Sequence, residues 1–339
     1  MKSAHTYYPN MDLMRYVMSI AVIIAHINGA IGSDIPFFLT SYEAVGGFFA
    51  ISGFLMYPNY IRHNNFKLYT LHRARRILPP YIFIVVAAAL CLVAVSCLTW
   101  REYFLSSGFW KYLAANLSFL NWLHPDLPGV FQGVRYATSA VNPSLWTMKV
   151  EWCLYLSVPI FVFLQAHLSK LRKETLVLEL IALSVLYRLI FTYFYFSTGS
   201  QIYDILRRQI FGQFSFFYAG MLIFFLRSKI ERHPLFTIAI GFFLWVVMKC
   251  SPYWFSIFLE PFAISAVVLG ISLLPYDITP LRHKNNISYH LYLFHYPVIQ
   301  LGIYFGIAVC GPTAMTLYVF AVTTLLSLFA HFSLKKIIQ

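Results

Sequence analysis

Long apolar segments recur along almost the whole chain and are separated by short polar connections. A membrane-spanning helix needs about 20 mainly apolar residues, and ten windows meet or approach this length: 12–32, 43–61, 78–98, 144–166, 175–196, 207–227, 234–250, 253–274, 286–308 and 312–333. The seventh window is short, so a tilted or re-entrant segment is an alternative there. The pattern predicts an all-α, polytopic membrane protein with about ten transmembrane helices.

One connection, at about residues 99–143, is much longer than the others. It holds tryptophans and prolines, which are typical of a membrane interface and of irregular backbone, among them Trp100, Trp110, Trp122, Pro125 and Pro128. We expect an extracytoplasmic interfacial loop carrying one surface helix. No internal repeat or low-complexity run is evident. We therefore expect residues 1–339 to form a single transmembrane domain without an appended soluble domain.

The composition agrees with this interpretation. Of the 339 residues, 60% are hydrophobic and 11% are charged, and the mean hydropathy is +0.68. Soluble domains are about 45–50% apolar and about 25% charged, so a soluble globular fold is excluded. Disorder is excluded as well, because it requires low hydrophobicity and a high charge density.

The distribution of lysine and arginine predicts the orientation of the helices. With the N-terminus inside, the inner connections hold 16 of the 25 basic residues and the outer connections hold 6. Because cytoplasmic loops are enriched in Lys and Arg, we expect both termini in the cytoplasm. The net charge of +13 is then mainly a consequence of topology. The expected partner is the lipid bilayer, and no nucleic acid is expected.

Few ionisable residues fall within the ten windows, which makes each of them informative. Such residues are costly in a bilayer, so by default they face a cavity, are paired and have a functional role. Eight of them are taken as candidates: Arg15, His26, Lys149, Glu151, Arg188, Glu260, His290 and His295.

Arg15 and His26 lie 11 residues apart in the first window. This separation is about 20° from three full helical turns, so the two side chains share one helix face, roughly 16 Å apart along the axis. The spacing suits an elongated ligand with a cationic anchor at one end and a base at the other. In the alternative, Arg15 extends to the inner interface and His26 is a packing residue.

His26 and Glu151 are expected at similar depth, because the first window runs outward and the fourth runs inward. Each lies roughly 9–11 Å below the outer interface at 1.5 Å per residue. A carboxylate beside an imidazole can fix its tautomer and stabilise the imidazolium. The two residues could form such a pair if their helices are neighbours.

A basic cluster, His72-Arg73-Ala74-Arg75-Arg76, directly precedes Pro79 and Pro80 at the predicted inner end of the third window. Proline is favoured near a helix start. Because arginine forks match phosphate oxygens, the cluster could bind the phosphates of a soluble cofactor. Binding of anionic lipid, or retention of topology, is the alternative.

The two histidines of the ninth window do not predict a metal site. His290 and His295 are five residues apart, which is a poor spacing for ligands on one helix face, and the His-Glu-x-x-His pattern is absent. We expect no metal. His295 could have a structural, a cavity-lining or a catalytic role.

Five segments resemble the acyltransferase-3 family of integral-membrane acyltransferases, and they follow the family's order. They are Asp12-Leu13-Met14-Arg15 with His26; Phe48–Leu55 (FFAISGFL); Arg73–Tyr81 (RARRILPPY); Leu145–Glu151 (LWTMKVE) with Tyr155 and Pro159; and Ser288–Pro297 with Tyr292 and His295. Each is weak alone, but together they cover residues 12–297 and are specific.

The resemblance implies transfer of an acyl group, usually acetyl, from cytoplasmic acyl-CoA to a hydroxyl of an extracytoplasmic or lipid-linked polysaccharide. It implies a multi-pass protein of the bacterial cytoplasmic membrane, with acyl-CoA as donor substrate and no tightly bound cofactor. His26 would deprotonate the acceptor hydroxyl, and Glu151 would hold or charge-stabilise His26.

The resemblance also implies where the substrates bind. Arg73 and Arg76 would contact the CoA phosphates, and the pantetheine arm would pass Arg15. Three further residues could contact the thioester or the acceptor or line the cavity: Ser52, Trp146 and His295. Direct attack on acyl-CoA is preferred to a covalent acyl-enzyme, because no Ser or Cys lies at helical spacing beside His26.

Two other functions fit the buried charges and the aromatic content. A transporter or flippase of a glycan or small solute would also place such residues in a cavity, although no inverted repeat is evident. A non-catalytic scaffold of a polysaccharide assembly complex would tolerate loss of Glu151 or Arg76. Within acyltransferases, transfer of succinyl or a longer chain depends on pocket volume, which the sequence does not give.

Overall fold

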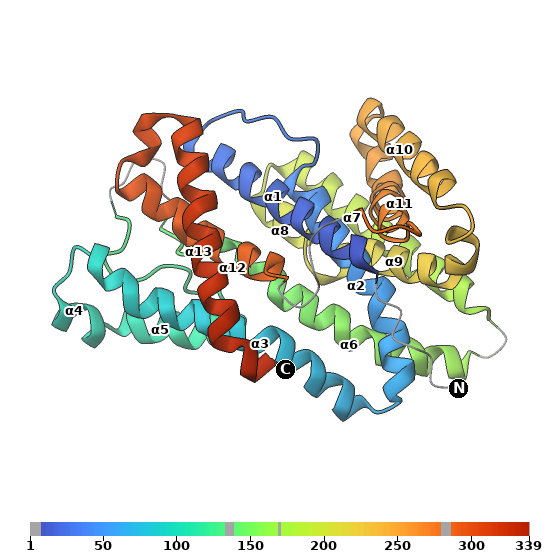
Figure 1. The fold of residues 1–339 in the computed structure, drawn as a ribbon, viewed down its shortest axis with the longest axis horizontal. Helices are drawn as coiled ribbons and strands as arrows, with labels where there is room; N and C mark the ends of the chain where they lie inside the picture. Colours follow the sequence, from blue (N-terminus) through green and yellow to red (C-terminus); the bar gives the residue numbers. More distant parts are fainter. Residues whose placement is uncertain (1–7, 133–138, 169–170, 279–285, 339) are drawn as a thin grey trace. The chain divides into compact units, whose positions relative to one another are not determined.

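A computed structural model of the chain describes residues 8–132, 139–168, 171–278 and 286–338. Helices dominate these ranges and no β-strand occurs in them, which confirms the all-α prediction (Figure 1). In chain order the elements are α1 (Pro9–Ile31), α2 (Ser41–His63), α3 (Phe66–Cys91), η1 (Leu92–Val95), α4 (Trp100–Leu105), α5 (Ser107–Leu117), η2 (Pro143–Leu145), α6 (Trp146–His167), α7 (Lys173–Thr198), α8 (Gln201–Arg207), α9 (Ile210–Ile230), α10 (Pro234–Cys250), α11 (Tyr253–Ser272), α12 (Ser288–Tyr304), η4 (Ile307–Cys310) and α13 (Pro312–Ile338).

Each of the ten predicted windows coincides with one long helix. By length and apolar composition alone, seven helical segments of the described chain could cross a membrane, and these contain α1, α3, α6, α7, α9, α11 and α13. Helix α10 is apolar but only 17 residues long. The protein is therefore a polytopic helical membrane protein, and the count of ten spans with cytoplasmic termini stays a prediction.

The third helix begins earlier than the sequence indicated. Helix α3 starts at Phe66, so Pro79 and Pro80 lie inside it and the basic cluster is helical. The expectation that these prolines mark a helix start was wrong. The start is set by Asn65, whose side-chain oxygen accepts a hydrogen bond from the Leu68 N–H at 3.0 Å, as an N-cap residue does.

In the part that the structure describes, the long connection holds two short α-helices, α4 and α5, instead of the one expected. Thr99 and Glu102 form a reciprocal capping box at the start of α4. The two hydrogen bonds that the Glu102 carboxylate accepts from Thr99 lower the pKa of Glu102. Ser106 then separates the helices, because its extended backbone ends α4 and its side chain accepts from the Gly108 N–H of α5.

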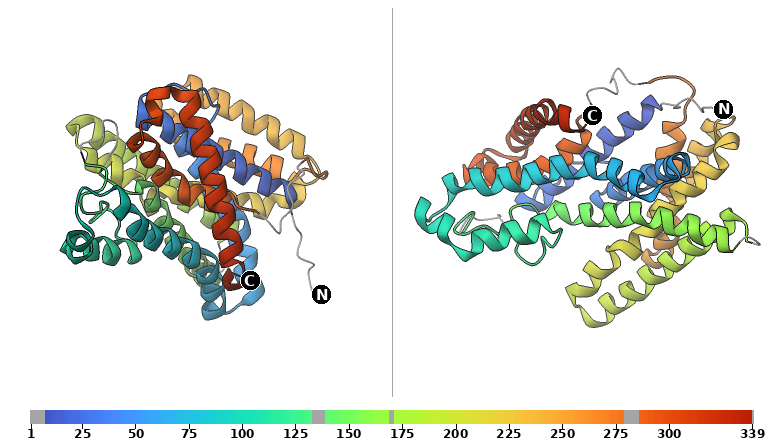
Figure 2. Two further views of the ribbon diagram at one scale, coloured as in Figure 1. Left: turned by 60° about the vertical axis from the view of Figure 1, so that its left-hand side comes forward. Right: turned by 90° about the horizontal axis from the view of Figure 1, so that it is seen from below.

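The chain divides into two compact units, which are described separately. The first comprises residues 1–18, 42–70 and 150–286. Within it α10 packs along α11 and α7 packs along α9 (Figures 1 and 2). Helices α2 and α9 approach closely, because a Cβ on Gly53 would fall 1.8 Å from the Phe217 carbonyl oxygen. Small residues permit such backbone contact between membrane helices.

The second unit comprises residues 19–41, 71–149 and 287–339. Within it α12 packs against α13, the red helix in Figure 2. Two buried tyrosines tie the helices of the long connection to α3. The Tyr81 hydroxyl donates to the Asn116 carbonyl at 2.6 Å, and the Tyr103 hydroxyl donates to the Ala89 carbonyl at 2.8 Å.

Three helix-interior prolines share one structural solution. A proline lacks the N–H that would bond the carbonyl four residues earlier, and a membrane interior offers no water to replace it. In each case a side chain from another segment of the same unit donates to the freed carbonyl. The donor–acceptor pairs are Tyr69 to Tyr155 at 3.1 Å for Pro159, Arg188 to Ile257 at 3.4 Å for Pro261, and Asn142 to Leu293 at 2.8 Å for Pro297.

Candidate functional site

His26 and His295 lie side by side in the second unit. His26 Nδ1 is 2.7 Å from His295 Nε2, and His295 Nδ1 donates to the Tyr292 carbonyl at 2.7 Å. His295 is fully buried, whereas His26 is half-buried. The ring of Tyr296 meets His26 edge-on, with centroids 5.3 Å apart. The predicted base from α1 and His295 of α12, for which the sequence left a structural, a cavity-lining and a catalytic role open, thus form one contact pair.

The segment before α6 holds α12 in place around this pair. Asn142 donates to the Leu293 carbonyl, and its own side-chain oxygen accepts from the Ser144 hydroxyl at 2.6 Å. One turn later, the hydroxyls of Thr147 and Tyr292 are 2.9 Å apart. All of these side chains are buried. The position of the His295 ring is therefore fixed by several hydrogen bonds besides its own.

The end of α1 beyond His26 borders an open depression of about 630 Å³, lined by residues 24, 25, 28 and 34–41. Asn28 organises this rim. Its side-chain oxygen accepts from the Ser33 hydroxyl and the Ile35 N–H, and its amide donates to the Ile35 carbonyl at 2.9 Å. A ligand in the depression would contact the helical turn that carries His26.

Glu151 and Ser52 are linked through Tyr155 in the first unit. The Tyr155 hydroxyl donates to Glu151 Oε1 and lies 3.4 Å from Ser52 Oγ. Glu151 and Tyr155 are four residues apart on α6, so they share a helix face. The close approach at Gly53 sets the position of the adjacent Ser52 on α2. The pairing of Glu151 with His26 stays a prediction.

The two arginine sites differ in their surroundings. Arg15 forms an ion pair with Asp12 at 2.8 Å, one turn earlier on α1, and its side chain is only 17% exposed. Arg73 is half-buried and Arg76 is exposed in the first half of α3. They are three residues apart and share a face. Trp146 is half-buried at the first position of α6.

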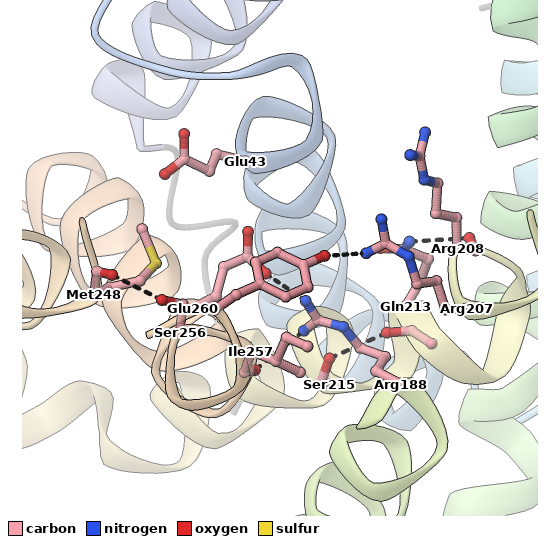
Figure 3. Close-up of polar contacts among 12 residues, drawn as sticks. Glu43, Arg188, Arg207, Arg208, Gln213, Ser215, Met248, Ser256, Ile257 and Glu260 are labelled. Atoms are coloured by element: carbon pink, nitrogen blue, oxygen red, sulfur yellow. Dashed lines mark hydrogen bonds and ion pairs between the residues drawn. The ribbon is translucent and has the colours of Figure 1, made fainter. Parts of the chain in front are cut away.

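Arg188 and Glu260 are two of the charged residues within the predicted membrane windows. They form an ion pair with each other (Figure 3). Their side chains are 2% and 14% exposed. The guanidinium also lies over the rings of Tyr42 and Phe216, 5.4 and 5.2 Å from the centroids. Glu260 compensates the charge of Arg188, and the two aromatic rings pack against its guanidinium. The pair therefore has the features of a structural contact.

A second carboxylate of this region is buried as well. Glu43 is 2% exposed and accepts from Lys249 Nζ at 2.8 Å and Trp245 Nε1 at 3.1 Å. Together with Arg188 and Glu260 it forms a compensated set that joins α2, α7, α10 and α11. No three metal-ligating side chains gather anywhere in the described ranges.

Sequence reasoning gave no separate role to Asn142, Thr147 or Tyr155. Tyr155 and Thr147 stand within the fourth family-like segment, so their positions were marked although their partners were not. Asn142 carried no comparable signal. A proline at 297 indicates that the carbonyl at 293 needs a donor, but the donor is 151 residues away in the chain.

Comparison with known proteins then decides the family. The profile of the acyltransferase domain family matches residues 8–332, which is nearly the whole chain. The chain belongs to the acyltransferase-3 family. The resemblance of the five segments is confirmed, and so is the enzyme class they predicted.

Individual relatives are more distant. The chain is 24% identical over 328 residues to O-acetyltransferase OatA of Staphylococcus aureus (strain NCTC 8325 / PS 47), covering 86% of this chain and 51% of the relative. It is 24% identical over 336 residues to peptidoglycan O-acetyltransferase OatA of Listeria monocytogenes, covering 87% and 50%. An O-acetyl transferase of Shigella phage Sf6 is 28% identical over 171 residues, covering 47% and 46%.

This acyltransferase-3 chain thus spans about half the length of these curated relatives. No solved structure matches it.

Proposed function

We propose that this chain is a membrane O-acyltransferase that transfers an acyl group, most simply acetyl, from acyl-CoA to a hydroxyl of an extracytoplasmic or lipid-linked polysaccharide. The match to the acyltransferase family over residues 8–332 carries the proposal. The names of its relatives, O-acetyltransferases and one peptidoglycan O-acetyltransferase, support the acetyl group and a glycan acceptor. The bacterial cytoplasmic membrane is the proposed location.

His26 is the proposed general base. It removes the proton of the acceptor hydroxyl as that oxygen attacks the thioester carbonyl. The carbon–sulfur bond breaks, an oxygen ester forms, and the proton on the imidazole passes to the leaving thiolate to give free CoA. The half-buried position of His26 next to the depression at the end of α1 supports access of an acceptor.

Arg73 and Arg76 are proposed to bind CoA phosphates, and Arg15 the passing pantetheine arm. Arg76 is exposed on α3, where a guanidinium can meet a phosphate in bidentate fashion. Glu151, hydrogen-bonded by Tyr155, is the proposed carboxylate of the site, and Ser52 is proposed to contact the thioester or acceptor from the same cluster.

The test of the proposed function uses inverted membrane vesicles from a bacterial strain that carries the chain. Vesicles receive acetyl-CoA labelled in the acetyl group, and base-labile label is counted in the extracted glycan. Since general-base catalysis contributes about 10²–10⁴-fold, His26→Ala should lower transfer by that factor. His167→Ala is the matched control, because His167 is an exposed helix-end histidine bonded to its own helix.

The same assay separates the alternatives. A transporter would leave the label out of the glycan in all variants, and full transfer by His26→Ala would reject the assigned base. Arg76→Ala should raise KM for acetyl-CoA with little change in kcat, because a contact to a distant phosphate is uniform binding. Arg62→Ala, another exposed arginine on the predicted cytoplasmic side, should leave KM unchanged.

A further inference from the structure

The hydrogen bonds around His295 have a defined direction. The Tyr292 carbonyl can only accept, so the nitrogen 2.7 Å from it, His295 Nδ1, must carry a hydrogen. In neutral His295 the other nitrogen, Nε2, is then a bare acceptor. His26 Nδ1 lies 2.7 Å from this acceptor and must donate to it. Neutral His26 therefore has its hydrogen on Nδ1 and its lone pair on Nε2.

The ring geometry supports a true hydrogen bond between the two imidazoles. Their planes differ by only 5° and their centroids are 5.0 Å apart. A separation of 5.0 Å is little more than the 2.7 Å between the nitrogens plus one ring radius on each side, so the rings meet edge to edge in a common plane. This places the donor hydrogen along the direction of the acceptor lone pair.

We propose that His295 is the positioning residue of the active site: it holds His26 in the Nδ1–H tautomer, so that Nε2 is the atom that takes the proton of the acceptor hydroxyl. This assignment rests on the proposed function of His26. An imidazole serves here in the place where hydrolases with a catalytic triad use a carboxylate to orient a histidine.

The arrangement serves both protonation states of His26. When Nε2 takes the proton, Nδ1 keeps its hydrogen and its bond to His295, so no second proton has to move. The bond becomes charge-assisted and therefore shorter and stronger. A neutral orienter also avoids placing a carboxylate in a fully buried position, which would be costly. His295 is 0% exposed and is itself held by the backbone of its own helix.

The tautomer can be measured directly in the unmodified protein. The chain has 11 histidines, and in protein labelled with 15N-histidine the imidazole shifts distinguish a protonated nitrogen from a bare one. The His26 signals are assigned by their absence in His26→Gln. The expected result is a hydrogen on Nδ1 and a bare Nε2. A hydrogen on Nε2 with a bare Nδ1 overturns the proposal, and this readout does not depend on activity.

Two substitutions test the role in turnover. Glutamine at 295 retains an oxygen that can accept from His26 Nδ1, whereas leucine retains no acceptor. Loss of the hydrogen-bond partner that orients a metal-bound histidine costs about 10–100-fold, and we expect a similar factor for His26. We expect His295→Leu to lower kcat by that factor with an unchanged KM for acetyl-CoA, and His295→Gln to recover most of the activity.

Three outcomes contradict the positioning role. They are full kcat in His295→Leu, equal loss in His295→Gln and His295→Leu, or an unchanged His26 tautomer in folded His295→Leu. If His295→Leu does not fold, the spectrum of the unmodified protein and the glutamine variant still decide. Failure of the proposed function is recognised separately, because no variant and not even the unmodified protein would then transfer acetyl to the glycan, whereas full transfer by His26→Ala would reject only the assigned base.

Discussion

The buried pair of Arg188 and Glu260 predicts how this chain responds to an isolated charge within its helices. Arg188→Met removes the guanidinium and leaves the Glu260 carboxylate, only 14% exposed, without the cation that pairs with it. The substitution also removes the donor to the Ile257 carbonyl at 3.4 Å and the cation over the rings of Tyr42 and Phe216. The uncompensated carboxylate should dominate the effect.

The magnitude follows from these contacts. Removing one partner of a buried ion pair costs about 3–5 kcal/mol. Each cation–ring contact, at more than 5 Å from the centroid, contributes about 1 kcal/mol or less. We expect Arg188→Met to lower the free energy of unfolding by about 3–5 kcal/mol. The double variant Arg188→Met/Glu260→Leu removes both charges and should lie within about 1 kcal/mol of the wild type, because apolar replacement of a buried pair is often neutral.

The assay is unfolding of purified protein in mixed micelles with increasing SDS, followed by circular dichroism. Arg208→Met is the matched control. Arg208 contacts Asp204 at 2.5 Å but is 45% exposed, so its loss should cost less than about 1 kcal/mol. The reasoning is refuted if Arg188→Met is no more harmful than Arg208→Met. It is also refuted if the double variant is as unstable as the single one.

Three further substitutions test the packing around the site. Gly53→Ala should destabilise by about 1–3 kcal/mol and lower transfer, because its Cβ would meet the Phe217 carbonyl at 1.8 Å; Gly29→Ala, with open space around its Cβ, should be harmless in the same unfolding assay. Tyr69→Phe should cost about 1–3 kcal/mol, since a buried carbonyl loses its donor; an unchanged unfolding curve would contradict this. Asn142→Ala should cost a similar amount and, unlike Tyr69→Phe, should broaden the His26 imidazole signals.

The helices were largely predictable because their signal is local. A run of about 20 apolar residues has few other structures available in a bilayer, and every predicted window contains a helix. The errors arose where local signals compete. Pro79 and Pro80 favoured a helix start, but the Asn65 cap begins α3 earlier and the helix continues through both prolines. Ser106 divides the expected surface helix because it acts as C-cap and N-cap at once.

The sequence singled out candidate site residues, but it did not predict the contacts that His26 and Glu151 make with His295 and Tyr155. Cost in a bilayer singled out His26, Glu151 and His295. Depth along a helix suggested Glu151 as the partner of His26, since depth was the only coordinate that the sequence supplied. Contact also depends on rotation about the helix axes, which the sequence does not give. His295 lies against His26 in one unit and Tyr155 against Glu151 in the other, and the pairing of Glu151 with His26 stays a prediction. Hydrogen-bond direction, which fixes the tautomer, requires these contacts to be known.

The prolines connect the fold to the site. Each proline leaves the carbonyl four residues earlier without its helical donor. The sequence therefore shows which carbonyl needs a donor, but the donor itself is supplied by a tertiary contact. For Pro297 the donor is Asn142, directly before η2, and it bonds the Leu293 carbonyl, one residue from the Tyr292 carbonyl that orients His295. The hydrogen bond that is missing within α12 is thus replaced by one that fixes the position of α12 relative to the segment before α6. The proline and the asparagine therefore act as one unit. Replacing Pro297 by Ala should restore the helical donor and make Asn142→Ala nearly neutral, and a double variant as unstable as Asn142→Ala alone would show that the asparagine acts elsewhere.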